Sequence, residues 1–250
     1  MRLALLASLS ASLLATACAD DAHDSATFAT ATDAQLLRAI DVATFEDVEL
    51  MFEIGGSLYG RNQPGCPAVS TTGLVTTVTT DCTTDNGWAV TGKLVITNFG
   101  FEDGVARDPA QPSSVEAFGL RATRDDRFQT LDGEVSVSFE GTTTDLAEVT
   151  AAIDVSDNNL VAHTDGVVRC ASGTCTFAEG WIGVDTLGEA TIDPSSNPEE
   201  QITLHGQQTL VVPIERDAEG CYAATVDGAA RQICDATQRR APNPWRTILR

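Results

Sequence analysis

The fold is decided by residues 161–177, whose sequence is VAHTDGVVRCASGTCTF. Apolar and polar residues alternate through this stretch, and two dipeptides that favour tight turns, Asp165-Gly166 and Ser172-Gly173, interrupt it. Alternation with a period of two is typical of a β-strand with one buried and one solvated face. Asp-Gly or Ser-Gly between such runs favours a β-hairpin. The stretch therefore predicts antiparallel strands joined by two-residue turns.

These two turns also predict which residues lie opposite each other. The first turn places His163 opposite Val168, on an apolar face, so His163 is expected to be a buried or half-buried core residue. The second turn places Cys170 opposite Cys175 in a non-hydrogen-bonded pair. In such a pair the Cα atoms approach to about 4.5 Å, which is close enough for a disulfide across the two strands.

The remaining cysteines extend this pattern. A turn at Asp227-Gly228 places Cys221 opposite Cys234, again in a non-hydrogen-bonded pair. Cys66 and Cys82 flank a Thr-rich hairpin, and their even separation requires a three-residue loop or a bulge. The expected disulfides are Cys66 with Cys82, Cys170 with Cys175, and Cys221 with Cys234. Paired cysteines of this kind supply neither a thiol nucleophile nor a zinc site.

The alternating pattern extends over most of residues 59–235 and predicts an all-β domain. Asp132-Gly133 is expected to form another two-residue turn, with Phe128 opposite Val137, and Gly92 is expected to mark a bulge. Each strand has one polar face, which excludes a parallel α/β architecture. We therefore expect an antiparallel meander that curls into a barrel or a sandwich.

Residues 33–58 precede this domain and are expected to form a helical segment packed on it. The stretch up to Ile54 has no glycine or proline, and Asp33 is placed to act as the N-cap. Gly55 and Gly56 would end the segment. Residues 48–54 also alternate as a strand would, so whether residues 44–54 form helix or strand stays open.

The beginning of the chain has the pattern of a secretory signal peptide over residues 1–17. Arg2 follows the initiating methionine, an apolar run from Leu3 to Leu14 comes next, and Ala15 and Ala17 precede Cys18. Disulfides are typical of proteins exported to an oxidising compartment. With Cys18 set aside, the seven cysteines leave an even number for such bonds.

The segment from Leu13 to Cys18 resembles the lipobox of bacterial lipoproteins, although Ala15 stands where that family prefers leucine. The resemblance implies that Cys18 is acylated, that residues 18–32 form a flexible tether, and that membrane lipid is a partner. It also implies a place in the bacterial cell envelope, at the outer membrane. The body resembles acidic, Thr-rich exported lipoproteins with a Cys-Pro motif, which implies no activity. The alternative is an unlipidated secreted protein.

The charge of the chain restricts its partners. It has 36 acidic and 15 Lys and Arg residues, a formal net charge of -21, so binding to nucleic acid is not expected. The cluster Asp154, Asp157, Asn158 and Asn159 lacks the spacing of a calcium loop, and neither a metal nor a cofactor is expected. Residues 236–250 form a basic tail that docks on the acidic body, contacts anionic lipid or is merely solvated.

Residues that could carry catalysis are few. His23 falls in the tether, His205 is expected to face solvent, and no hydrolase or zinc-protease motif is present. The adjacent acids Asp125 and Asp126 are a weak signal, and Trp88 and Trp181 are expected in the core rather than stacked on a sugar. We expect no enzymatic activity but a structural, adhesive or ligand-binding envelope lipoprotein with a protein or glycan partner. The alternative is an extracytoplasmic glycan hydrolase that uses a carboxylate pair.

Overall fold

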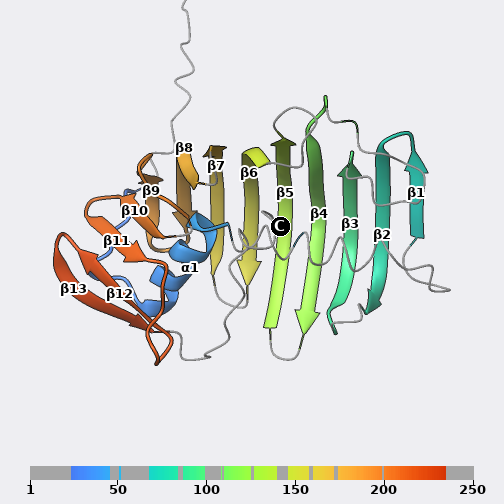
Figure 1. The fold of residues 1–250 in the computed structure, drawn as a ribbon. Helices are drawn as coiled ribbons and strands as arrows, with labels where there is room; N and C mark the ends of the chain where they lie inside the picture. Colours follow the sequence, from blue (N-terminus) through green and yellow to red (C-terminus); the bar gives the residue numbers. More distant parts are fainter. Residues whose placement is uncertain are drawn as a thin grey trace, which may run out of the picture.

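The computed structural model describes residues 24–45, 51, 68–83, 87–98, 108, 110–124, 127–139, 146–157, 160–171, 174–198 and 200–234. Within these ranges the chain forms helix α1 (Asp33–Ala43) and a sheet of 13 strands (Figure 1). The strands are β1 Ala68–Thr72, β2 Val75–Thr83, β3 Ala89–Thr97, β4 Ser113–Arg124, β5 Arg127–Phe139, β6 Leu146–Asp157, β7 Val161–Ala171, β8 Thr174–Val184, β9 Gly188–Ile192, β10 Gln201–His205, β11 Thr209–Pro213, β12 Cys221–Val226 and β13 Ala229–Cys234.

Each strand pairs with the next strand along the chain, and every pair is antiparallel. The predicted antiparallel all-β meander is therefore confirmed. β1 and β13 lie at opposite ends of the strand order and do not pair with each other. The described strands thus form an open sheet. Of the two expected forms, barrel and sandwich, the closed barrel is wrong.

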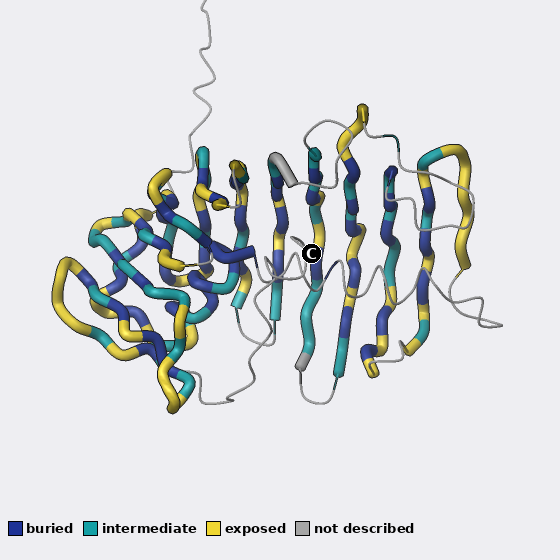
Figure 2. The backbone as a smooth tube through the Cα atoms, in the orientation of Figure 1, coloured by how far each residue is buried: buried dark blue, intermediate teal, exposed yellow. Residues whose placement is uncertain are grey.

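The two ends of the sheet differ in shape. β1 to β8 lie side by side in a row, whereas β9 to β13 turn over around α1 (Figure 1). The helix contacts β7 and β8 on one side and β13 on the other. We call the face of the sheet that α1 covers the inner face and the opposite one the outer face. Buried and exposed positions alternate along the strands, as a two-faced sheet requires (Figure 2).

Helix α1 is shorter than the helical segment expected over residues 33–58. Its N-cap is Thr32 rather than Asp33. The Thr32 side chain accepts a hydrogen bond from the backbone N–H of Gln35, and the Gln35 side chain accepts one from the backbone N–H of Thr32, which together form a capping box. Thr44 is the C-cap, and Phe45 follows with a φ of 59°. The question of helix or strand over residues 44–54 falls almost entirely outside the described residues.

Residues 24–32 pack on the sheet, so the flexible tether expected over residues 18–32 is wrong for this part. Ala26 donates to the Glu189 carbonyl at 2.7 Å and accepts from Gln207 at 2.8 Å. The Phe28 side chain is fully buried. Arg231 donates from its guanidinium to several carbonyl oxygens of this segment, those of Phe28, Ala29 and Ala31, and to the Asp33 carboxylate. The segment is thus bonded to β9, to the loop after β10 and to β13.

Two of the predicted turns lie inside strands. β5 runs through Asp132-Gly133, and β7 runs through Asp165-Gly166. Phe128 consequently pairs with Thr123 rather than with Val137. Similarly, His163 pairs with Asp154 and Gly183 rather than with Val168. Both glycines serve close packing instead, since a side chain at Gly133 would meet β6 and one at Gly166 would meet the ring of Phe45.

The first hairpin also differs from its prediction. Thr72 pairs with Val75, so Gly73 and Leu74 form a two-residue turn and not the three-residue loop or bulge that was expected. The register of β3 with β4 shifts at Gly92, between Thr91 and Lys93, as predicted. The extra residue of the bulge is in β4, however, because β4 also shifts against β5 between Ala117 and Leu120. The alternation of β3 therefore continues across Gly92, and its buried side chains, with that of Trp88 before it, are Val90, Leu94 and Ile96.

Candidate ligand-binding face

Two cross-strand disulfides hold the C-terminal half of the sheet in register. Cys170 and Cys175 are bonded with Cα atoms 4.1 Å apart, and Cys221 and Cys234 with Cα atoms 4.2 Å apart. Both bonds join directly opposite residues, which confirms the predicted pairs. Cys82 is also disulfide-bonded. Its predicted partner Cys66 and the predicted lipidation site Cys18 lie outside the described residues.

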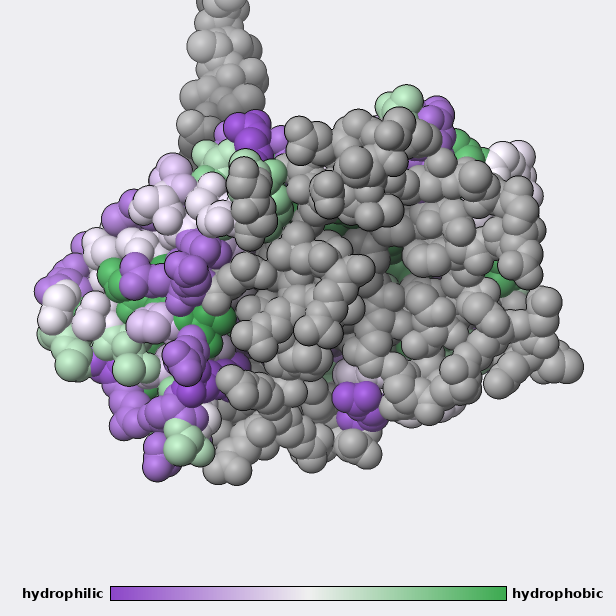
Figure 3. All heavy atoms as spheres, in the orientation of Figure 1, coloured by the Kyte–Doolittle hydropathy of each residue, from purple (hydrophilic) through white to green (hydrophobic). Residues whose placement is uncertain are grey.

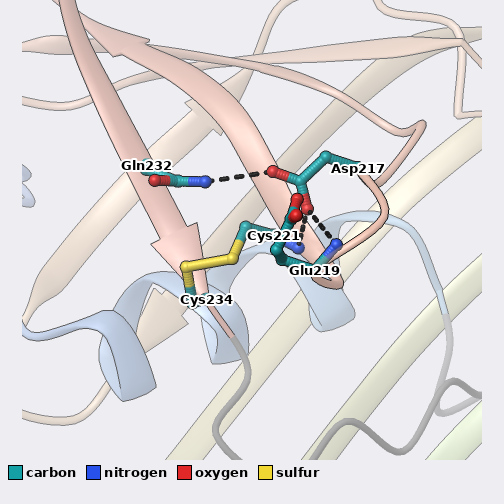
Figure 4. Close-up of a disulfide and its surroundings, with 5 residues drawn as sticks. All are labelled: Asp217, Glu219, Cys221, Gln232 and Cys234. Atoms are coloured by element: carbon teal, nitrogen blue, oxygen red, sulfur yellow. Dashed lines mark hydrogen bonds between the residues drawn. A yellow bond between two sulfur atoms is a disulfide. The ribbon is translucent and has the colours of Figure 1, made fainter.

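The loop before β12 supports the second disulfide (Figure 4). The Asp217 carboxylate accepts the backbone N–H groups of Cys221 and Glu219 and the side-chain amide of Gln232. The Cys221 N–H, first of all, lowers the pKa of Asp217 below its usual value of 3.8. Asp217 therefore contacts both strands that carry the bonded cysteines, β12 through Cys221 and β13 through Gln232, and holds them together.

A histidine–carboxylate pair joins the end of β10 to the loop between β9 and β10. As predicted, His205 is on the exposed side of its strand; its Nε2 lies 2.9 Å from Asp193. Ser195 donates to the same carboxylate through its backbone N–H and its hydroxyl, at 2.7 and 2.5 Å. Because the Ser195 hydroxyl is bonded to Asp193 and not to His205, this group is not arranged as a nucleophile and its base.

The stability that this loop contributes to the fold is expected to fall at low pH. Hydrogen bonds from the Ser195 side chain and then from His205 lower the pKa of Asp193 from 3.8 to about 2. A carboxyl whose pKa is lowered on folding stabilises the fold above its unfolded pKa, and that stabilisation is lost as pH falls through its folded pKa. Melting temperatures measured from about pH 5 down to about pH 2 should fall less steeply in Asp193→Asn than in the wild type. Equal slopes would contradict this assignment.

The outer face carries an exposed aromatic side chain on β8. Trp181 is 37% exposed and stacks on the His163 ring of β7, with ring centroids 4.5 Å apart. His163 Nδ1 donates to the Asp154 carboxylate of β6 at 2.7 Å. Val161, which is 54% exposed, lies on the same face of β7. We call Asp154, His163 and Trp181 the tryptophan cluster.

The orientation of the tryptophan cluster corrects two sequence predictions. Trp181 was expected in the core, but the register of β7 and β8 shifts between Val167 and Val168, which leaves Ala178 as an extra residue in β8. After such a bulge, odd-numbered residues that would have faced inward face outward instead. Trp181 therefore points outward, although Cys175 and Phe177, before the bulge, point inward. His163 is on the outer face because no turn at Asp165-Gly166 reverses the strand; its side chain is 29% exposed.

A second group of aromatic side chains lies on the outer face of β3, β4 and β5. The Lys93 ammonium lies 4.3 Å from the Phe118 ring, and the Arg121 guanidinium lies 4.4 Å from the Phe128 ring. Phe118 is 41% exposed. Each cation stabilises and partly covers one ring. The outer face thus presents cationic and aromatic groups over β3–β5 and the tryptophan cluster over β6–β8.

Other predicted site residues have different outcomes. Trp88 is buried as expected, and the Arg124 guanidinium lies 4.4 Å from its ring. The acids Asp125 and Asp126, and Asn158 and Asn159 of the acidic turn, lie outside the described residues, as do His23 and the tail 236–250. Among the residues that the structure does describe, no three His, Cys, Asp or Glu side chains are grouped to hold a metal ion.

The described surface near the curled end of the sheet is mixed in polarity. In the view of Figure 3, hydrophilic side chains dominate over β9–β13, with small hydrophobic areas between them. None of the helices in the described ranges is long and apolar enough to cross a membrane.

Comparison with known protein families, characterised proteins and solved structures finds no match to this chain. The function is therefore argued from the chain's own residues. Sequence reasoning considered Trp181 and His163 separately and missed the contact between them, since only the bulge at Ala178 brings Trp181 onto the face of His163.

Proposed function

We propose that the protein is a non-catalytic, lipid-anchored protein of the bacterial cell envelope that binds a ligand on the outer face of its sheet. The signal sequence, the lipobox-like segment ending at Cys18 and the two cross-strand disulfides support export and anchoring. β6 to β8, which carry the tryptophan cluster, belong to the row of strands from β1 to β8, and each of them pairs with a neighbour on both sides, which gives the cluster a firm support.

The exposed Trp181 side chain carries the proposal of ligand binding. An aromatic ring on a rigid strand, with polar groups beside it, suits a ligand that has both C–H faces and hydroxyl groups, such as a glycan. With Nδ1 of His163 donating to Asp154, the neutral imidazole offers Nε2 as an acceptor. The second oxygen of Asp154, whose side chain is 68% exposed, accepts further hydrogen bonds from hydroxyl groups.

A neutral glycan fits the charge of the protein better than an anionic one. The net charge of -21 repels polyanions, and the tryptophan cluster itself contains a carboxylate. Hydrolysis of the glycan would need two carboxyl groups facing each other across the scissile bond. The Asp154 carboxylate is bonded to His163, and a second exposed acid of the outer face, Asp165, pairs with Trp181. Binding rather than cleavage is therefore part of the proposal and rests on the hydrogen bond that holds Asp154 to His163.

Replacement of Trp181 by alanine tests the binding site. We expect Trp181→Ala to weaken co-sedimentation with insoluble neutral polysaccharide about tenfold, because the ring loses its stacking contact. The fold should remain, since the side chain is exposed. Val161→Ala, on the same face of the neighbouring strand, is the matched control and should bind as the wild type does. Equal binding by wild type and Trp181→Ala would refute the glycan site.

Replacement of Cys18 by alanine tests whether the protein is anchored to a membrane by lipid. Mass spectrometry of the wild-type N-terminus should find an acylated Cys18, and the protein should fractionate with membranes. Cys18→Ala should appear in the soluble fraction, because a protein without the acyl chains has lost its apolar anchor. A soluble, unacylated wild type would refute the lipid anchor and leave the proposal for the outer face intact.

A further inference from the structure

The bulge of β4 places an exposed phenylalanine ring on the outer face. The register with β5 shifts between Ala117 and Leu120, so Phe118 and Gly119 stand together opposite Asp132. Ala117 and Leu120 are both buried, whereas the Phe118 side chain points away from the core and is 41% exposed. The Gly119 N–H donates to the Asp132 carboxylate at 2.5 Å, which holds this carboxylate at the bulge.

Direct cross-strand pairs connect this bulge to the tryptophan cluster. Asp132 of β5 pairs with Asp154 of β6, and Asp154 pairs with His163 of β7. Trp181 of β8 stacks on the His163 ring. The phenylalanine, the two carboxylates and the stacked rings therefore follow one another across five neighbouring strands. We call Phe118, Asp132, Asp154, His163 and Trp181 the aromatic row.

The side chains of the aromatic row are accessible on the outer face. Phe118 is 41% exposed and Trp181 is 37% exposed. The side chains of Asp154 and His163 are 68% and 29% exposed, and Asp132 is exposed as well. β4 to β8 lie in the row of strands from β1 to β8, and each of them pairs with a neighbour on both sides (Figure 1). Paired strands therefore fix the spacing of these groups.

The distance between the two ends of the aromatic row indicates a long ligand. Neighbouring strands lie about 4.8 Å apart, so Phe118 and Trp181, which are four strands apart, are separated by roughly 19 Å. A single sugar ring cannot contact both side chains. The step from strand to strand is close to the length of one sugar unit in an extended, β-linked chain. Such a chain, laid across the strands, would bring a new unit over each strand.

The two carboxylates in the middle of the row favour a ligand that donates hydrogen bonds. Asp132 and Asp154 lie directly opposite each other, and like charges in such a pair destabilise a sheet. One oxygen of each is bonded within the protein, to the Gly119 N–H and to His163 Nδ1 respectively. The second oxygen of each can accept a hydrogen bond from a hydroxyl group. Hydroxyl groups along the edge of a sugar chain supply such donors, whereas a polyanion would be repelled.

We propose that the aromatic row binds one extended, β-linked neutral polysaccharide chain, which lies across the strands and stacks on Trp181 at one end and on Phe118 at the other. This inference rests on the glycan binding proposed for the tryptophan cluster and adds the length and shape of the ligand. Hydroxyl groups of the sugar units between the two rings donate to Asp132 and Asp154. The Lys93 ammonium, 4.3 Å from the Phe118 ring, adds a hydrogen-bond donor at that end.

The dependence of binding on chain length tests the aromatic row. In isothermal titration calorimetry, the wild type should bind cellohexaose at least about tenfold more tightly than cellobiose, because only the longer chain reaches both rings. Phe118→Ala should bind cellohexaose about tenfold more weakly than the wild type and should bind cellobiose equally well. Trp181→Ala should weaken the binding of both probes.

Phe128→Ala is the matched control for Phe118→Ala. Phe128 is also an outer-face ring beside a cation, with the Arg121 guanidinium 4.4 Å from its centroid. It lies four residues along β5 from Asp132, about 13 Å outside the row, so its loss should leave the binding of both probes unchanged. Phe118→Leu keeps an apolar side chain at the bulge but has no ring, and it should bind cellohexaose as weakly as Phe118→Ala does.

The outcomes separate the aromatic row from the smaller glycan site. The row would be refuted, and the site at Trp181 left standing, if cellohexaose bound no more tightly than cellobiose. The same holds if Phe118→Ala and Phe118→Leu both bound cellohexaose as the wild type does. A wild type that bound neither probe would refute the glycan site of the outer face itself, and the aromatic row with it.

Discussion

Replacing Gly133 by alanine is expected to lower the free energy of unfolding by about 3–5 kcal/mol, among the largest effects of any single substitution in the described sheet. Gly133 lies in the middle of β5 with a φ of +125°, a conformation that residues with a side chain rarely adopt. A Cβ atom there would also lie 2.9 Å from the Cα of Ile153 and closer still to the Ala152 carbonyl oxygen. Both contacts are with backbone, so β6 would have to move away from β5 and disturb the core beneath.

Gly119→Ala is the matched control for this substitution. Gly119 also has a positive φ, of +52°, but its added Cβ would meet no atom within 4 Å. We expect a loss of about 1 kcal/mol, from backbone conformation alone. Urea unfolding followed by circular dichroism measures both values. If Gly133→Ala cost no more than Gly119→Ala, the close approach of β5 and β6 would be wrong.

The position of Gly133 also explains why the turn predicted at Asp132-Gly133 is absent. Asp132-Gly133 and Asp165-Gly166 have the same local pattern as Asp227-Gly228, which does form a turn with positive φ at both residues. In a turn the glycine adopts a positive φ to reverse the chain. In β5 it adopts one so that β6 can approach. A dipeptide cannot distinguish these uses, because the difference lies in strands that are distant in sequence.

The hairpins with cysteines were predicted correctly for a physical reason. In the pairs Cys170–Cys175 and Cys221–Cys234, a turn dipeptide and a disulfide place independent restrictions on the same register. Asp165-Gly166 had no such second restriction; its predicted pair of His163 with Val168 rested on the turn dipeptide and on the alternation of the residues beside it. Polar and apolar residues alternate on each side of the dipeptide whether the strand continues or reverses there, so the pattern could not expose the error.

The tryptophan cluster was beyond prediction from the sequence. Its two rings belong to neighbouring strands, and they lie on one face only because Ala178 is an extra residue in β8. Gly183 follows Trp181 on that face, and a Cβ atom there would lie 3.6 Å from the indole ring. A bulge without a glycine or proline at the site leaves no mark in the alternation that precedes it.

Phe28→Ala is expected to destabilise the protein by about 3–5 kcal/mol, as the loss of a large buried side chain does. Its small and acidic neighbours suggested a tether that could not fold, but this segment has a different source of stability. The Phe28 ring is fully buried, and the flanking backbone is bonded to the rest of the chain: Thr27 to Leu187, and Ala29 to the Gln208 side chain. A single aromatic anchor and these hydrogen bonds order a segment that its mean composition assigns to disorder.

Thr30→Ala provides the comparison for this substitution, because Thr30 is exposed in the same segment and its change should alter stability by less than about 0.5 kcal/mol. Thermal unfolding of both variants measures the difference. Limited proteolysis adds a local readout, since Phe28→Ala should expose residues 24–32 to cleavage while the disulfide-bonded hairpins stay intact. If both variants unfolded at the same temperature and were cleaved alike, residues 24–32 would behave as the tether that the sequence predicted, and the packing of Phe28 would be refuted.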